Sequence, residues 1–168
     1  MSTRATIHFE EIQTRRWDAK RQKLITLRKP KVSTDAIIYR HNDGYPEGLG
    51  QELVRFIQEV RQLQDSRLDD PSYLAAKWVV FDVLLHQAYH AASNEQRKAV
   101  GQEPYYPDPI PRLDFLSIGI VMEDPGDIEY RYHVIADGKV ESITWDHIGY
   151  GDTWDAHGTI STLEGEIA

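Results

Sequence analysis

Hydrophobic and polar residues alternate at the start of the chain. Ala5, Ile7 and Phe9 fall on one side of the segment from Thr3 to Glu10, which predicts a half-buried strand. Runs rich in β-forming residues predict further strands at 35–41, 115–122, 128–135 and 140–146, and the run at 24–27 predicts a strand that ends at Lys29-Pro30. In the 128–135 strand the two faces separate, with Ile128, Tyr130, Tyr132 and Val134 on the apolar face and Glu129, Arg131 and His133 on the polar one.

Two other segments place apolar residues at helical spacing. From Gly48 to Leu63 such residues recur every three or four positions, which predicts a first helix. Asp70 and Pro71 have the order of a helix N-cap followed by proline at the first helical position. The second predicted helix begins there and ends near Ser93-Asn94.

The segments between and after these elements complete the predicted architecture. Four prolines within residues 101–111 exclude regular structure there, and the chain after Trp145 is rich in Gly and Asp and is expected to fray. Asp137-Gly138 predicts a hairpin turn, so the last three strands are expected to form a meander. The elements predict one α+β domain over residues 1–168, a mostly antiparallel sheet of about five or six strands with two helices packed on one face.

Composition removes several classes of site. The chain has no cysteine, which excludes a disulfide framework, a thiolate zinc site and a cysteine nucleophile. The N-terminal residues lack the apolar core of a signal peptide, and no run approaches the length of a membrane span. We therefore expect a cytoplasmic protein without a membrane partner.

Charge is distributed unevenly along the chain. Residues 1–32 carry nine Lys or Arg against three acidic residues, whereas residues 113–168 carry two against twelve. The basic stretch includes Trp17, but the net charge of −8 and the pI near 5.3 argue against a general nucleic-acid footprint. Direct binding to nucleic acid is therefore predicted to be absent.

The segment Y-R-H-N-D-G-Y-P-E-G-L-G at residues 39–50 concentrates residues suited to ligand binding at a helix N-terminus. The free amides and the helix dipole there favour an anion, which Arg40 and His41 could grip. A purely structural turn explains the same residues, with Gly44 at positive φ and Pro46 near the helix start. The spacing matches neither common nucleotide-binding glycine loop. The candidate ligand- or partner-binding residues are Arg40, His41, Asp43, Tyr45, Gly48 and Gly50.

Two groups of residues have the side-chain types of a metal site without its order. His86 and His90 stand four residues apart on the second predicted helix, but no Glu completes an H-E-x-x-H motif. The C-terminal run offers Asp146, His147, Asp152, Asp155 and His157 without the order of an EF-hand. Such a His pair is more often the boundary of an apolar stripe, and the C-terminal residues are ordinary loop formers, so no metal and no cofactor is predicted.

Three blocks of the chain resemble a known family. They are S-T-R-A-T-I at 2–7, Y-R-H-N-D-G-Y-P-E-G-L-G at 39–50 and D-I-E-Y-R-Y-H-V at 127–134. In this order they resemble uncharacterised small proteins of bacteriophages, prophages and bacteria that begin S-T-R-A and carry Y-R-H-x-D-G-Y-P-x-G-x-G. The resemblance implies a setting in mobile elements, and the host cytoplasm if the protein is phage-encoded.

Three functions are compatible with these features. The first is a non-enzymatic binding protein that recognises a host protein or a small anionic ligand, for example as an inhibitor of a host defence factor. The second is a small enzyme acting on a phosphorylated or nucleotide substrate, with Arg40 holding phosphate and His41 or Asp43 as acid-base groups. The third is a structural or self-assembling protein that uses its strand edges.

Overall fold

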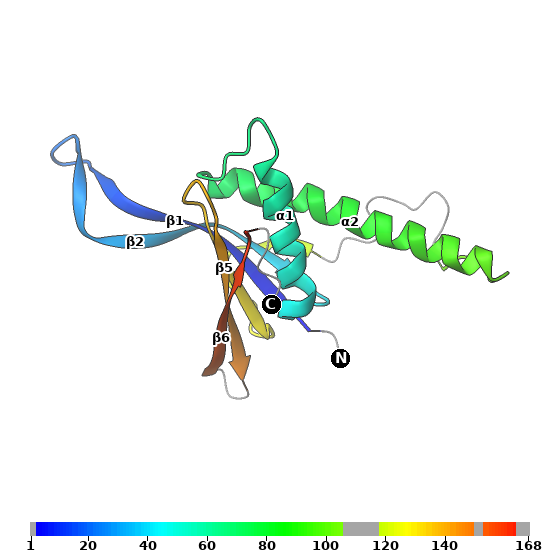
Figure 1. Ribbon diagram of the computed structural model, residues 1–168. Helices are drawn as coiled ribbons and strands as arrows, with labels where there is room; N and C mark the ends of the chain where they lie inside the picture. Colours follow the sequence, from blue (N-terminus) through cyan, green and yellow to red (C-terminus); the bar gives the residue numbers. More distant parts are fainter. Residues whose placement is uncertain (1–2, 106–117, 150–152, 164–168) are drawn as a thin grey trace.

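The computed structural model describes residues 3–105, 118–149 and 153–163 and contains a six-stranded mixed sheet and two α-helices (Figure 1). The strands are β1 (Ala5–Asp18), β2 (Lys23–Arg40), β3 (Ile118–Val121), β4 (Tyr130–Ile135), β5 (Ser142–Gly149) and β6 (Thr153–Ser161). Their order in the sheet is β3-β2-β1-β4-β5-β6. The α+β class, the mostly antiparallel sheet and the number of strands are confirmed.

β1 and β2 form a hairpin whose outer part leaves the rest of the molecule. They pair antiparallel from Ala5 opposite Arg40 to Asp18 opposite Lys23, and Figure 1 shows their far ends projecting as a two-stranded ribbon. We define residues 12–32 as the basic arm. The strand predicted to end at Lys29-Pro30 and the strand predicted at 35–41 are thus one continuous strand. Pro30 falls opposite the irregularity between Gln13 and Arg15 and breaks no regular ladder.

The centre of the sheet joins distant parts of the chain. β1 pairs with β4 in parallel, and β3 pairs with β2 on the other side. The predicted meander of the last three strands is therefore wrong, because β3 is separated from β4 by two strands. The meander that does form is β4-β5-β6, and β6 occupies a region that was expected to fray.

The two helices follow the predicted pattern. A single π-helical turn, η1 (Pro46–Gly50), leads into α1 (Gln51–Arg61), which buries Leu53, Phe56, Ile57 and Val60. In α2 (Pro71–Ala99) the Asp70 side chain accepts hydrogen bonds from the amides of Ser72 and Tyr73, which confirms the predicted N-cap. This helix runs past the predicted end at Ser93-Asn94, and Asn94 is buried within it.

One hydrophobic core joins the helices to the sheet. Ile7 and Phe9 of β1 and Tyr132 of β4 belong to the same buried cluster as Phe56 of α1 and Trp78 of α2. Since side chains alternate along a strand, the residues between the core positions of β1 and β4 lie on the opposite face of the sheet. That face carries the network described below.

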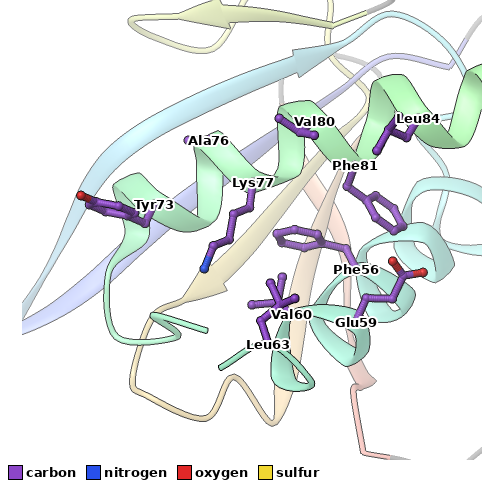
Figure 2. A pocket seen from close by; sticks show the side chains of 10 residues that line it. All are labelled: Phe56, Glu59, Val60, Leu63, Tyr73, Ala76, Lys77, Val80, Phe81 and Leu84. Carbon is purple, nitrogen blue, oxygen red and sulfur yellow. The ribbon is translucent and has the colours of Figure 1, made fainter. Parts of the chain in front are cut away.

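An apolar groove of about 550 Å³ lies between α1 and α2 (Figure 2). Its lining is apolar except for Glu59 and Lys77, and Leu63, Val80 and Leu84 within it are about half exposed.

Within the described part of the chain, neither helix has the combination of length and apolar character needed to cross a membrane.

Candidate functional site

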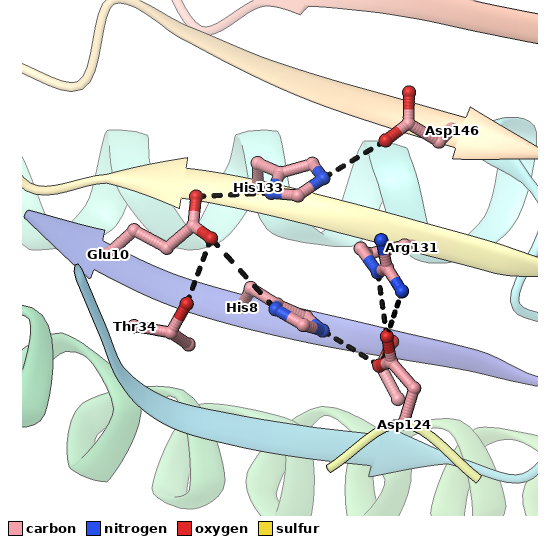
Figure 3. A network of polar contacts seen from close by, with 8 residues as sticks. His8, Glu10, Thr34, Asp124, Arg131, His133 and Asp146 are labelled. Carbon is pink, nitrogen blue, oxygen red and sulfur yellow. Dashed lines mark hydrogen bonds and ion pairs between the residues drawn. The ribbon is translucent and has the colours of Figure 1, made fainter. Parts of the chain in front are cut away.

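A network of histidines and carboxylates covers the face of the sheet opposite the core (Figure 3). His8 and Glu10 are two residues apart on β1, so both point to this face. His133 lies directly beside His8 in the register of β1 and β4, and the two rings are 5.5 Å apart. Both β1 residues are nearly buried, with His8 8% and Glu10 5% exposed.

His133 bridges two carboxylates. Its Nδ1 lies 3.1 Å from Oε2 of Glu10, and its Nε2 lies 3.1 Å from Oδ2 of Asp146 on β5. Thr34 of β2 donates a hydrogen bond of 3.1 Å to Oε1 of Glu10. These contacts run across four neighbouring strands, β2-β1-β4-β5, and hold Glu10 and the His133 ring in place.

His8 repeats this arrangement with another carboxylate. Its Nε2 lies 2.7 Å from Oδ1 of Asp124, and its Nδ1 faces Glu10 at 3.9 Å. Asp124 belongs to the loop after β3, where it also accepts hydrogen bonds from Thr6 and a two-pronged contact from Arg131. The loop is fixed to the sheet because three residues on β1 and β4 bind its aspartate.

The surroundings shift the pKa values of these groups. Burial alone raises the pKa of Glu10, but the hydrogen bond and charge of His133 outweigh it and hold this pKa below its usual range. Burial alone lowers the pKa of His133, yet Glu10 and Asp146 keep it above its ordinary value. Burial likewise opposes ionisation of Asp124, but contacts from His8, Thr6 and Arg131 hold its pKa far below normal. The carboxylates of Glu10 and Asp124 are therefore suited to facing positive charge.

A second polar cluster is centred on Arg40, whose side chain is 1% exposed. Its guanidinium contacts Asp82 of α2, lies 3.2 Å from Glu52 of α1 and donates a 2.7 Å hydrogen bond to Nε2 of His86. A further hydrogen bond of 3.1 Å goes to the carbonyl oxygen of Asn42. The guanidinium joins β2 to both helices and is enclosed, so a ligand anion has no access to it.

The other predicted site residues are only partly brought together. Asp43, Tyr45 and Gly48 line a hollow of about 350 Å³ beside the start of α1, whereas Gly50 is buried. His41 lies outside this lining, and its ring accepts or donates a 3.1 Å hydrogen bond with Tyr39. The charged residues that line the hollow are Asp43, Glu47, Glu52 and Arg55. This balance favours a cation over an anion.

The turn itself differs from the expected one. Asp43, not Gly44, has positive φ, at 55°. Gly44 is required for a close approach, because a Cβ there would lie 2.7 Å from Cβ of Ala5. Tyr132 donates a 2.8 Å hydrogen bond to the carbonyl oxygen of Gly44, which fixes the turn to β4.

The candidate metal-binding residues named from the sequence contact different partners in the structure. His86 faces the guanidinium of Arg40. The rings of His86 and His90 are 6.3 Å apart. Of the C-terminal donors, Asp146 contacts His133, and the His147 ring packs 4.7 Å from that of Tyr130. Asp152 and the side chain of Asp155 lie outside the described part of the structure. His157 is exposed and pairs with Asp146 across β5 and β6.

The basic arm forms a separate surface. Eight Lys or Arg and one acidic residue give it a formal charge of +7, and since the whole chain carries −8, the remainder carries −15. Among the residues that the structure describes, the only ion pair of an arm side chain is Arg21 with Asp18, at 3.8 Å. Trp17 and Leu24 stand opposite each other on the arm, each 61% exposed.

The sequence did not predict that His8, Glu10 and His133 form a group. The alternation of β1 and β4 placed all three on polar faces, and this was the available signal. The alternation does not indicate that β1 and β4 are neighbours in the sheet.

The chain matches no family model, no curated protein and no solved structure.

Proposed function

We propose that this protein binds nucleic acid through the basic arm. The observation that carries the proposal is the separation of charge: a projecting two-stranded ribbon of +7 on a remainder of −15. Its cationic side chains are exposed and, apart from Arg21, have no ion-pair partner among the described residues. Lys and Arg in this state are available to phosphates, whose neutralisation supplies most of the affinity of non-specific nucleic-acid binding.

Apolar exposure on the arm fits the same partner. Trp17 and Leu24 are directly opposite in the β1–β2 register, and Arg15 lies two residues from Trp17 on the same face. An exposed aromatic ring beside a cation can stack on a base while the cation contacts the backbone, as in proteins that bind single strands. A two-stranded β-ribbon also fits the major groove of a duplex.

The negative charge of the remainder does not cancel the positive charge of the basic arm. At about 3.3 Å per residue, Asp18 lies roughly 20 Å along β1 from Ile12. The Debye length at physiological ionic strength is about 8 Å, so the outer arm is screened from much of the acidic charge. The low pI, which argued against nucleic acid in the sequence, thus describes the average charge and not the surface presented by the arm.

The proposal keeps a binding protein as the function and replaces the small anion at residues 39–50 with a polyanion at residues 12–32. Arg40 supports this change because its guanidinium is enclosed by Asp82, Glu52 and His86. The resemblance to phage and prophage proteins adds a setting to the proposal, in which the protein acts in the host cytoplasm on nucleic acid. Interference with a host factor would then occur at that nucleic acid.

Fluorescence anisotropy with labelled single-stranded and duplex oligonucleotides tests the proposal. A triple variant in which Gln replaces Arg15, Arg16 and Lys20 removes three exposed cations from the arm. At physiological salt we expect at least a ~10-fold loss of affinity, since three phosphate contacts disappear.

A matched control removes three exposed cations from the remainder of the molecule, at Arg55, Arg67 and Lys139. This variant should bind within about twofold of the native chain. The proposal fails if the native chain does not bind either oligonucleotide, or if the arm and control variants lose affinity equally.

Trp17→Ala tests whether the arm prefers single-stranded or duplex nucleic acid. Loss of stacking should weaken single-strand binding more than duplex binding.

A further inference from the structure

We propose that His8, Glu10 and His133 form a binding site for one divalent first-row transition-metal ion, of which Zn²⁺ is the representative. The site is separate from the basic arm and does not depend on it. Its residues come from the paired central strands β1 and β4, at positions fixed by the sheet register. Rigid strands are suitable supports for a metal site because they hold donor atoms in a set geometry.

The donor atoms are already close together. One ligand atom from each of the three residues lies within 4.8 Å of the others. Zinc binds imidazole nitrogen and carboxylate oxygen at about 2.0–2.2 Å, so tetrahedral ligands are roughly 3.3–3.5 Å apart. Nδ1 of His133 and Oε2 of Glu10 are 3.1 Å apart, and Nδ1 of His8 is 3.9 Å from Oε1 of Glu10. The first pair would have to separate by a few tenths of an ångström and the second pair to approach by a similar amount for these atoms to enclose an ion.

The second nitrogen of each ring supplies an independent argument. Nε2 of His8 faces Asp124 at 2.7 Å, and Nε2 of His133 faces Asp146 at 3.1 Å. A carboxylate on the far nitrogen fixes the ring, sets the tautomer and increases the basicity of the near nitrogen, as it does for most metal-binding histidines. Both near nitrogens, the Nδ1 atoms, point toward Glu10.

Charge favours an ion at the same place. With neutral imidazoles, the carboxylates of Glu10, Asp124 and Asp146 outnumber the guanidinium of Arg131 by two charges. A divalent ion balances this excess and takes the place of the proton that otherwise joins His133 to Glu10.

The Arg40 cluster serves as a contrast within the same molecule. Glu52, Asp82 and His86 also place ligand atoms within 4.8 Å of one another. There, however, the guanidinium of Arg40 contacts all three residues and already supplies the positive charge. In the described part of the chain, by contrast, no Lys or Arg forms an ion pair with Glu10, and Arg131 contacts Asp124 instead.

The donor set defines the chemistry. Two imidazoles and one carboxylate suit Zn²⁺, Fe²⁺ or Co²⁺ better than Mg²⁺ or Ca²⁺, which prefer oxygen ligands. Three protein ligands leave a coordination position open, as in catalytic zinc sites and unlike closed structural ones. The His133 side chain is 22% exposed and gives that position a route to solvent.

Isothermal titration of the full chain with Zn²⁺, together with the visible spectrum after Co²⁺ addition, tests the site. We expect one ion per chain, and loss of stoichiometric binding in His8→Gln and in His133→Gln. Asp146→Asn keeps a partner for His133 but removes its charge, and should weaken binding by ~10–100-fold. His86→Gln, in the Arg40 cluster, is the matched control and should bind Zn²⁺ like the native chain.

Circular dichroism of the metal-free variants shows whether each one folds. If either histidine variant does not fold, X-ray absorption of the zinc-loaded native chain decides, because the proposed site requires two imidazoles in the coordination shell. The proposal is overturned if the native chain binds no Zn²⁺, if folded histidine variants bind it unchanged, or if the coordination shell has fewer than two imidazoles.

Discussion

Arg40 illustrates what a single buried charge does in this fold. Its guanidinium neutralises Asp82, whose side chain is 2% exposed, and donates to His86. In Arg40→Met the packing volume is nearly kept, but Asp82 is left buried without its partner. Removing one member of a buried ion pair typically costs about 3–5 kcal/mol, and we expect a loss of this size in the free energy of unfolding measured with urea.

The exposed pair of Arg55 and Glu59 provides the control for this measurement. Both side chains are more than half exposed, at 58% and 53%. Arg55→Met should therefore change the free energy of unfolding by less than about 1 kcal/mol. Equal losses in the two variants would contradict an energetic role for the buried cluster.

His86 gives the stability a dependence on pH. Burial and the charge of Arg40 lower the pKa of His86 below its ordinary value. Protonation thus favours the unfolded chain, and the stabilisation that is present above about pH 6.5 is lost as the pH falls through the lowered pKa. The charged and titratable groups around this ring are Arg40 of β2, Asp43 of the turn, Glu52 of α1, and Asp82, Tyr89 and His90 of α2.

The test compares His86→Gln with the native chain at pH 7.5 and pH 5.5. Gln can still accept from Arg40 but does not titrate, so the native chain should lose more stability on acidification, by at most about 1.4 kcal/mol. Burial raises the pKa of Asp82, which acts in the opposite direction, but Asp82 is present in both proteins. If both proteins lose the same stability between these pH values, His86 is not the responsible group.

At the residue level, the sequence predicted the side of a strand on which a residue lies better than the contacts that its side chain makes. Alternation correctly placed Tyr132 and Val134 in the core and His133 on the other face. It could not show that Arg40 points inward, because Asp82 and His86 are more than forty residues away. Gly44 was identified as necessary for the wrong reason, since its closest neighbour is Ala5 across the hairpin and its φ is not positive.

At the level of elements, local patterns located the helices and most strands but not their length. The cap at Asp70 and the stripe of α1 are encoded within a few residues, and both were predicted. β2 was divided because Pro30 usually ends a strand, whereas here it lies at an irregularity of an exposed ribbon. β6 was overlooked because its Gly and Asp residues are typical of loops and its pairing with β5 outweighs that tendency.

The basic arm should be dispensable for folding. None of residues 12–32 belongs to the hydrophobic core cluster, and Ile12 stands directly opposite Val32. Replacing Gln13 to Lys31 with Asn-Gly joins the two strands through a turn suited to a hairpin. We expect the shortened chain to unfold cooperatively, with a free energy within about 1 kcal/mol of the native value, since surface changes rarely cost more.

Thermal and urea unfolding of the shortened chain, together with its circular dichroism, provide the measurement. The same protein should fail to bind either oligonucleotide. A shortened chain that is unfolded would show that the arm supports the sheet, and a folded one that still binds would move the nucleic-acid surface elsewhere.

At the level of the whole molecule, the decisive features are long-range pairings. β1 joins β4 across more than a hundred residues, and this parallel pairing brings His8 beside His133. Neither strand alone indicates its neighbour, because hydrophobic alternation specifies a face and not a partner. Among the strands of the described residues, none other pairs with the basic outer halves of β1 and β2. A difference in charge along the sequence thus becomes a difference in space.

This spatial separation predicts how salt will affect binding. Each phosphate contact contributes about −0.9 to the slope of log K against log salt for duplex DNA and about −0.7 for single strands. Removing Arg15, Arg16 and Lys20 should reduce the steepness by up to about 2.7 on a duplex and about 2.1 on a single strand. The control variant at Arg55, Arg67 and Lys139 should keep the native slope, because these residues lie outside the arm. Anisotropy titrations between 50 and 300 mM salt, about a sixfold range, measure both slopes, and a slope that falls equally in both variants would show that phosphates contact the body of the protein as well as its arm.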